Sequence, residues 1–221
     1  LGIFVMFQRF SNVEGFTYSQ VLLCFSIMLL EFSLAEMFAR SFDSFSSLVR
    51  SGEFDRILVR PQNEILQVLG SRFELTRAGR LLQAVVMFVY GISESEIAWD
   101  PLKILTVIFM LIGGIAVFTG LFMIYAGLCF FTLDGLEFMN IFTDGAREFG
   151  KYPMGVYGKK ILLFSIFIVP YAWIQYYPFL YLLGQRDSVW FVVLPLGACW
   201  FLIPAWLLWR TGVKRYQSSG S

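Results

Sequence analysis

The sequence predicts an all-α membrane protein that forms a single transmembrane domain over residues 1–221. Hydrophobic residues make up 57% of the chain and charged residues only 15%, whereas soluble domains carry about 25% charged residues. The mean hydropathy is +0.68. Long apolar runs alternate with polar segments, and a run of about 20 apolar residues suffices to cross a bilayer as a helix. These observations exclude an ordinary soluble domain.

The apolar runs define the expected spans in chain order. Residues 1–10 are apolar but too short to cross, so we interpret them as the outer end of a truncated first span. A signal peptide is disfavoured, because a basic start and a small-residue cleavage site are absent. Five full spans follow, and the completed bundle has six. These spans cover 16–39, 73–92, 102–133, 159–177 and 189–210, separated by polar segments over 40–72 and 134–158.

The basic residues predict the orientation. Fourteen of the seventeen fall into the segments 40–80, 134–160 and 210–215. If each apolar run crosses once, these segments lie on one side of the membrane and the remaining three basic residues on the other. The basic side is expected to be cytoplasmic, which places both chain termini in the cytoplasm.

The same argument makes the 102–133 run a single crossing. Its length of about 48 Å exceeds a hydrocarbon core of about 30 Å, so it must tilt, overhang or bend. Gly113, Gly114 and Gly120 are either its bending points or sites of close helix–helix contact.

The run over 161–183 contains two prolines, each of which removes a backbone donor and bends a helix. The polar break at Gln175 and Pro178 favours a span that ends early, followed by a short re-entrant hairpin over 178–187. A single kinked helix, bent at Pro170 and Pro178, is the alternative. Re-entrant backbone is tolerated only where it is buried in protein or lines water.

Two carboxylates lie in the second half of the 16–39 run, where an ionisable residue is a functional candidate. Glu36 precedes Arg40 by four residues, so we expect a helical ion pair near the cytoplasmic surface. Glu31 lies deeper and has no partner nearby in the sequence. It either pairs between helices or lines a transport pathway.

The polar stretch over 40–80 is patterned as three short helices. Apolar residues from Phe42 to Val49 recur at helical spacing, and Gly52 ends that helix. Glu53 begins a new turn, which Pro61 stops. Apolar residues from Ile65 then begin a third helix. This mixture of charges and large apolar side chains is typical of a patch that docks on another protein; a solvated interfacial loop is the alternative.

Several chemistries are excluded. The chain has no histidine, which removes His-ligated metals, Ser-His-Asp triads and zinc-protease motifs, and we expect no metal site. The three cysteines lie in separate apolar runs and are expected to be core residues. No phosphate-binding loop is present, so any ATP hydrolysis takes place on another polypeptide. An intramembrane enzyme using Glu31, an ion-driven carrier and a membrane scaffold are the competing hypotheses.

Four segments carry a resemblance to a known family. The chain resembles the ABC-2 type permeases of bacterial ATP-binding-cassette exporters, in their compact branch of type V-like fold. The resemblance covers nearly the whole chain, and its first segment is the most specific. The segments are RSGEFDRILVRP (50–61), FMNIFTDGAREF (138–149), YP (152–153) and RYQSSGS (215–221).

The resemblance implies a permease subunit rather than an enzyme, in the bacterial cytoplasmic membrane. It implies six spans, re-entrant helices before the last span, and a cytoplasmic coupling helix between the second and third. Two permease chains, identical or homologous, pair above two ATPase subunits, which bind ATP and Mg²⁺; this chain binds no cofactor and no nucleic acid. The substrate is expected to be amphipathic, drug-like or lipid-like, and to be exported.

Carried onto this chain, the resemblance implies an ATPase-contacting coupling region with Phe54 and Leu58 as apolar anchors. The charged residues of this region would set the orientation of the contact. Residues of the coupling region are Phe45, Leu48, Val49, Gly52, Glu53, Phe54, Asp55, Arg56, Leu58, Arg60 and Pro61. The residues expected to line the substrate pathway are Glu31, Tyr171, Gln175 and Tyr176.

Overall fold

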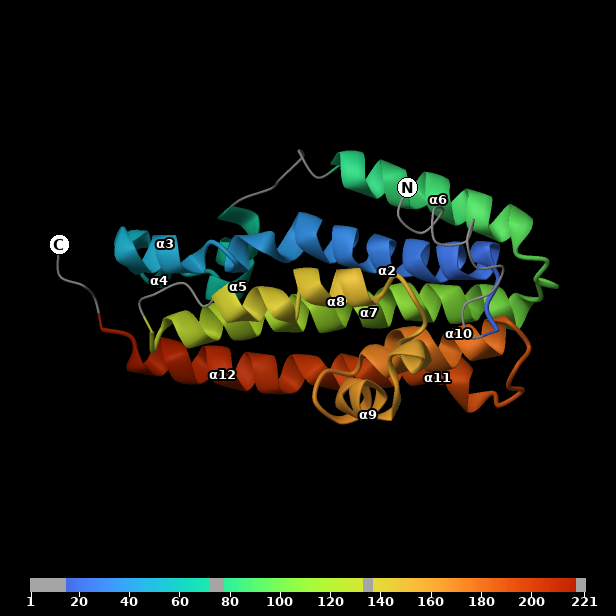
Figure 1. Ribbon diagram of the computed structural model, residues 1–221. Coiled ribbons are helices and arrows are strands. Elements are labelled where there is room, and N and C mark those ends of the chain that lie inside the picture. Colours follow the sequence, from blue (N-terminus) through green and yellow to red (C-terminus); the bar gives the residue numbers. More distant parts are fainter. Residues whose placement is uncertain (1–14, 72–77, 133–136, 218–221) are drawn as a thin grey trace.

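The computed structural model describes residues 15–71, 78–132 and 137–217, and these ranges are almost entirely helical and contain no β-strand. Three long helical segments lie side by side and give the molecule an elongated shape (Figure 1). The helices in chain order are α2 (Tyr18–Ala39), η1 (Arg40–Phe42), α3 (Phe45–Arg50), α4 (Glu53–Leu58), α5 (Glu64–Ser71), α6 (Ala78–Glu94), α7 (Pro101–Cys129), η3 (Glu137–Ile141), α8 (Asp144–Phe149), η4 (Met154–Tyr157), α9 (Lys159–Phe167), the π-helix η5 (Ala172–Tyr176), α10 (Tyr177–Leu182), α11 (Trp190–Gly197), η6 (Ala198–Phe201) and α12 (Leu202–Arg215).

Within the described ranges, three helical segments are long and apolar enough to cross a membrane: Tyr18–Arg50, Pro101–Cys129 and Trp190–Arg215. A fourth is added if α9 and the η5–α10 segment, which meet at a bend of 99°, count as one broken span. The all-α membrane fold is therefore confirmed, while the six-span count stays a prediction. The expected first span and the start of the 73–92 span lie outside the described residues.

Helix α7 is the central helix, with α2, α11 and α12 packed against it. It begins where Asp100 accepts a hydrogen bond from the Lys103 backbone N–H at 2.7 Å and Pro101 occupies the first turn. It then continues without interruption for 29 residues. A Cβ added to Gly114 would overlap the Glu31 side chain of α2. A Cβ at Gly113 would overlap the Pro195 carbonyl of α11. These glycines therefore permit close helix contacts, as one of the two alternatives predicted.

Helix α7 is about 43 Å long and shows no break, so it does not shorten by bending. The ends of α7 and α12 extend well beyond the beginning of α6 (Figure 1). Helices α3, α4 and α5 fold at this extended end, which is the end predicted to be cytoplasmic. The polar stretch therefore packs at the end where α7 and α12 extend beyond α6.

The bend near the last spans differs from the prediction. Helix α9 lies across the bundle, and the chain turns by 99° at residues 168–171, around Pro170 (Figure 1). Gln175 and Pro178 do not mark a break, because the π-helix η5 runs directly into α10. Proline lacks a backbone donor, but Pro178 lies in the first turn of α10, where that loss is tolerated. The bend therefore lies near Pro170 and not at Gln175 and Pro178, and the turn that follows α10 occupies 183–189. The 159–177 span and the 178–187 re-entrant hairpin stay predictions.

The outward faces of α6 and of the first half of α7 remain apolar and exposed. On α6, the side chains of Leu82, Val86 and Val89 are each at least 60% exposed. Helix α2, by contrast, is buried nearly all round between α6 and α7. An apolar exterior around an apolar core is what a lipid-facing bundle requires.

Gly114→Ala should destabilise the protein by about 1–3 kcal/mol, because the added Cβ overlaps the Glu31 carboxyl group. Glu31→Ala removes that group, so the same glycine substitution should cost much less in the Glu31→Ala background. Thermal unfolding in detergent measures both. Gly79→Ala is the matched control, because its added Cβ meets nothing within 4 Å. Equal losses from Gly114→Ala in the two backgrounds would contradict the contact.

Candidate functional site: a cytoplasmic coupling region and a charged belt

The polar stretch folds as its pattern predicted. Helix α3 ends before Gly52, whose φ of +70° is a left-handed conformation that glycine adopts without strain. Helix α4 begins at the next residue and ends at Leu58, three residues before Pro61. Helix α5 follows, and the Asn63 side chain caps it by accepting a hydrogen bond from the Ile65 N–H at 2.9 Å.

An aromatic cluster fastens α3 and α4 to the long helices. The cluster comprises Phe45, Phe54, Phe130, Trp209 and Tyr216. Phe45 lies 4.9 Å between ring centroids from each of three partners, which are Phe54, Phe130 and Trp209. Phe54 and Tyr216 meet edge to face at 5.2 Å. These rings come from α3, α4, the end of α7 and α12, so the cluster joins four segments that are distant in the sequence.

The cluster corrects the role expected for Phe54. Its side chain is fully buried inside the chain's own core, so it presents no surface to another protein. Phe45, Leu48 and Val49 are buried as well. On α4 and the residue that follows it, the exposed apolar side chains are Leu58, at 40%, and Val59, at 83%. Leu66 of α5 and Phe131 after α7 are exposed as well, at 68% and 45%. The other exposed members of the predicted region are Glu53, Arg56, Arg60 and Pro61, with Gly52 and Asp55 partly exposed.

A groove of about 460 Å³ lies between α4 and α5. The Gln67 side chain holds its walls together by donating hydrogen bonds to the carbonyls of Ile57 and Gln62, both at 3.0 Å. Its mouth is polar on the α4 side, where Arg56 and Arg60 lie. The lining residues are Leu48, Glu53, Arg56, Ile57, Arg60, Gln62, Leu66, Gln67, Gly70 and Ser71.

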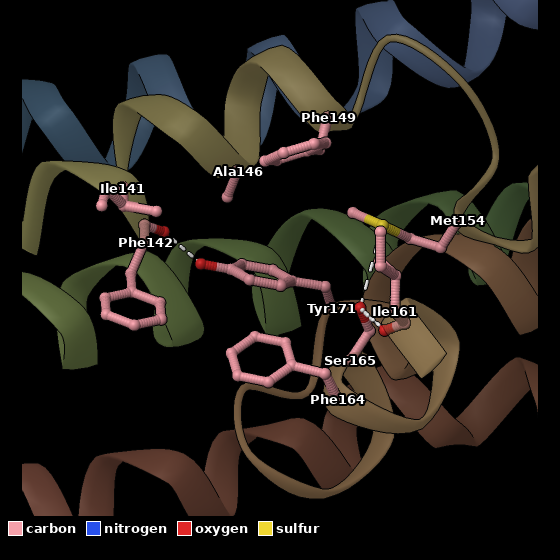
Figure 2. A pocket seen from close by; sticks show the side chains of 9 residues that line it. All are labelled: Ile141, Phe142, Ala146, Phe149, Met154, Ile161, Phe164, Ser165 and Tyr171. Atoms are coloured by element: carbon pink, nitrogen blue, oxygen red, sulfur yellow. Dashed lines mark hydrogen bonds between the residues drawn. The ribbon is translucent and has the colours of Figure 1, made fainter. Parts of the chain in front are cut away.

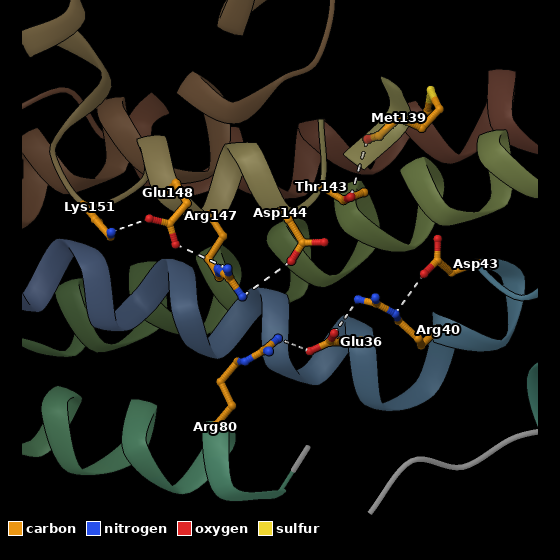
Figure 3. Close-up of polar contacts among 10 residues, drawn as sticks. All are labelled: Glu36, Arg40, Asp43, Arg80, Met139, Thr143, Asp144, Arg147, Glu148 and Lys151. Carbon is orange, nitrogen blue, oxygen red and sulfur yellow. Dashed lines mark hydrogen bonds and ion pairs between the residues drawn. The ribbon is translucent and has the colours of Figure 1, made fainter. Parts of the chain in front are cut away.

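A second set of polar residues, here called the charged belt, surrounds α2 where α6 begins (Figure 3). The Glu36 side chain is fully buried and accepts from Arg40 at 2.5 Å, which confirms the predicted helical pair. Arg80 of α6 donates to the other Glu36 oxygen. The belt comprises Glu36, Arg40, Asp43, Arg80, Asp144, Arg147, Glu148 and Lys151.

The belt also attaches α8 to α2. The Arg147 guanidinium lies 5.3 Å from the centre of the Phe32 ring, and the Arg80 guanidinium lies 5.7 Å from the same ring. Arg147 pairs with Asp144 at 3.5 Å and with Glu148 at 3.3 Å. Lys151 donates to Glu148, and this hydrogen bond holds the pKa of the Glu148 carboxyl below its ordinary value.

Glu31 is placed differently from Glu36. It is fully buried between α2 and α7, against Gly114. Neither of its carboxyl oxygens has a hydrogen-bond partner among the described residues. The interhelical pair expected as one alternative is therefore not observed in the described part of the chain. A role in the substrate pathway stays a prediction.

The other three residues expected along the pathway fasten the 142–155 segment to the membrane body. The Tyr171 hydroxyl donates to the Phe142 carbonyl. The Gln175 amide donates to the Gly150 carbonyl at 3.0 Å. The Tyr176 ring lies so close to Gly155 that an added Cβ there would overlap it. All three contacts are structural, and lining a pathway stays a prediction for each residue.

Among the described residues, no group of three acidic or cysteine side chains lies close enough to hold a metal ion. What the arrangement can do is mechanical: an exposed tip on α4 is coupled through the aromatic cluster to α7 and α12. Long apolar helices joined to a compact polar end are compatible with a membrane-embedded transport subunit.

The comparisons with known proteins agree with this class. Residues 1–220 match the model of a family described as ABC-2 family transporter protein, so the chain belongs to the ABC-2 transporter family and is a permease subunit. The predicted family is thereby confirmed. No curated protein and no solved structure matches the chain.

Sequence reasoning missed the partner of Glu36 on α6. Arg80 follows Glu36 by 44 residues, and no helical period connects positions that far apart. The one available signal was a basic residue at the beginning of an apolar run. A buried carboxylate beside a single cation in sequence is a reason to look for a second cation on a neighbouring helix.

Arg80→Ala should destabilise the protein, because the buried Glu36 carboxylate loses one of its two cations. Breaking a buried pair costs about 3–5 kcal/mol, and we expect the lower end because Arg40 remains. The same substitution should cost far less in a Glu36→Gln background. Arg186→Ala, on an exposed turn, is the control. If Arg80→Ala unfolds at the temperature of the parent protein, the pair does not contribute to stability.

Phe54→Ala should lower the free energy of unfolding by about 3–5 kcal/mol, because it leaves a cavity inside the aromatic cluster. Val59→Ala removes a side chain that is 83% exposed and should change stability by less than about 0.5 kcal/mol. Thermal denaturation of the two purified variants provides the comparison. Similar stabilities would show that Phe54 is not held in the core.

Proposed function

We propose that this chain is the permease subunit of an exporter that moves an amphipathic, drug-like or lipid-like substrate out of the bacterial cytoplasm. In this proposal two permease chains, identical or homologous, pair in the cytoplasmic membrane with their termini inside. Two copies of a separate ATPase subunit bind ATP and Mg²⁺ and dock on the cytoplasmic end. The family and the apolar helices support this placement.

The observation that carries the ATPase contact is the exposed tip of α4. Leu58 and Val59 are large apolar side chains that face solvent at the polar end of the molecule. Arg56 and Arg60 flank them and are exposed too. An apolar centre with a charged rim is the usual composition of a protein–protein contact. We therefore assign the anchor role to Leu58 and Val59 in place of Phe54.

The aromatic cluster supplies the route by which movement of the tip reaches the membrane. Phe54 is on the inner face of the same short helix that presents Leu58 outward. A push on α4 therefore acts on Trp209 of α12 and on Phe130 at the end of α7. Binding of ATP to the partner would favour one arrangement of the two permease chains, and hydrolysis the other.

The double substitution Leu58→Glu and Val59→Glu tests the contact. It replaces two exposed apolar side chains, so the fold should persist, while affinity for the ATPase should fall at least about tenfold. The tagged chain is purified in mild detergent from its native membranes, and the co-purifying protein is identified and quantified. Val189→Glu serves as the control, because this residue is also exposed and directly precedes α11, a helix that lies far from α4 (Figure 1).

A stoichiometric ATPase that is retained by the control and lost from the double variant would support the proposal. Unchanged retention by the double variant would contradict the assignment of the α4 tip. Recovery of the chain without any ATPase would favour the ion-driven carrier or scaffold hypothesis. Transport that an uncoupler abolishes and ATP does not affect would favour the carrier.

A further inference from the structure

We propose that a cavity between α8 and α9 holds one acyl chain of an anionic phospholipid from the cytoplasmic leaflet, with the lipid phosphate near Lys159 and Lys160. This lipid would be a bound constituent of the permease and not its transported substrate. The proposal rests on the shape, polarity, location and charge of the cavity (Figure 2).

The cavity has a volume of about 190 Å³, a buried floor and an exposed rim. Its floor is made by side chains that are each less than 5% exposed: Ala146, Met154, Ser165 and Tyr171. Its rim carries apolar side chains that are each more than a third exposed: Ile141, Phe149, Ile161 and Phe164. The difference in exposure between floor and rim shows that the pocket opens at the protein surface.

The side chains that line the cavity have no free hydrogen-bond donor for a polar ligand. Its two hydroxyl groups both donate to backbone carbonyls, Ser165 to Ile161 at 2.9 Å and Tyr171 to Phe142. All the other lining side chains are apolar. An apolar cavity of about 150 Å³, lined by Leu, Ile and Phe, stays dry and binds small apolar guests. The pocket therefore suits a hydrocarbon chain.

Two observations argue that the cavity lies at the level of the lipid headgroups. Its α8 wall belongs to the segment that carries Arg147 and Lys151 of the charged belt. Its α9 wall runs across the bundle, in the orientation of an interfacial helix (Figure 1). Beyond the rim, Phe167 and Ile168 continue the exposed apolar surface at 70% and 59% exposure. An acyl chain can thus enter sideways from the bilayer.

The charges beside the mouth favour an anionic headgroup. Residues 144–160 contain four basic and two acidic side chains. Both acidic ones already pair within the belt, through Arg147 and Lys151. Lys159 and Lys160 are exposed at the beginning of α9, one turn or less from the rim residue Ile161. Lysines at a membrane surface each strengthen binding to anionic lipid, by roughly fivefold.

The test measures lipid bound to the purified chain. The protein is reconstituted in nanodiscs of phosphatidylcholine with a minor fraction of phosphatidylglycerol, extracted in mild detergent, and examined by native mass spectrometry. The parent chain should retain one phosphatidylglycerol. Ala146→Phe, which fills the floor, and Ile161→Glu, which places a charge at the rim, should each abolish retention of either lipid. Because Ile161 is partly exposed, its variant keeps the test valid if Ala146→Phe does not fold.

Lys159→Gln with Lys160→Gln should leave one lipid bound but reduce the preference for phosphatidylglycerol over phosphatidylcholine, by roughly fivefold for each lysine. The matched control is Lys214→Gln with Arg215→Gln, an exposed basic pair at the end of α12. Glycerol phosphate, which carries the headgroup chemistry without acyl chains, should not displace the lipid.

Three results would overturn the proposal. The first is a parent chain that retains no lipid. The second is equal retention by the parent and by a folded Ile161→Glu or Ala146→Phe variant. The third is release of the lipid when the co-purified ATPase turns over ATP, which would identify the occupant as transported substrate. The ATPase should remain bound to every variant, so a failure here is distinguishable from a failure of the permease assignment.

Discussion

The aromatic cluster that joins α3 and α4 to α7 and α12 is the interaction on which the functional architecture depends. Within lipid, helices gain little from burying apolar surface, because the surrounding acyl chains are equally apolar. Helices α3 and α4 are different, because their charged outer faces place them in water, where burying Phe45 and Phe54 is strongly favourable. The two short helices, too short to be stable alone, are held by this burial. The cluster therefore makes the polar tip a rigid extension of α7 and α12.

The charged belt has a different role, because it pairs ionised side chains that lie beside the apolar bundle. Glu36 is fully buried, and the cost of burying its charge is offset by Arg40 at the beginning of η1 and Arg80 of α6. The guanidinium groups of Arg80 on α6 and Arg147 on α8 both lie over the Phe32 ring. The ion pairs of Glu36 and the Phe32 ring thus hold α6 and α8 against α2. Glu31, one helical turn deeper, lacks such partners among the described residues.

Local features of the fold could be predicted from the sequence because they depend on neighbouring residues. Spacing of apolar residues located α3, Gly52 ended it, and Pro61 followed the end of α4. Phe54 is a large apolar residue in a polar stretch, so its side chain was expected to be buried in a contact. The sequence pattern does not distinguish a contact with another protein from a contact with α7 and α12, because the second depends on packing between distant segments. The structure shows the second.

The same limit explains the other differences. Pro170 and Pro178 carry equal local signals, and only the packing of η5 and α10 decides which of them bends the chain. The pairing of Glu36 with Arg80 is likewise a contact between helices. Glycines in α7 were compatible with bends or with close contacts, and the neighbours Glu31 and Pro195 decide for contacts. Sequence patterns predicted the helices, but which side of each helix is buried, and against which neighbour, depends on tertiary packing.

The central claim is that α4 moves as one body with α12. Spin labels attached at Val59→Cys and Lys214→Cys, both exposed positions, would test it by electron–electron distance measurements in a Cys199→Ser background. The complex with its ATPase is compared without nucleotide and trapped with ATP. We expect the distance within one chain to stay constant, while the distance between the Val59 labels of the proposed pair of permease chains changes. A shift of the distance within one chain on ATP trapping would contradict the rigid connection.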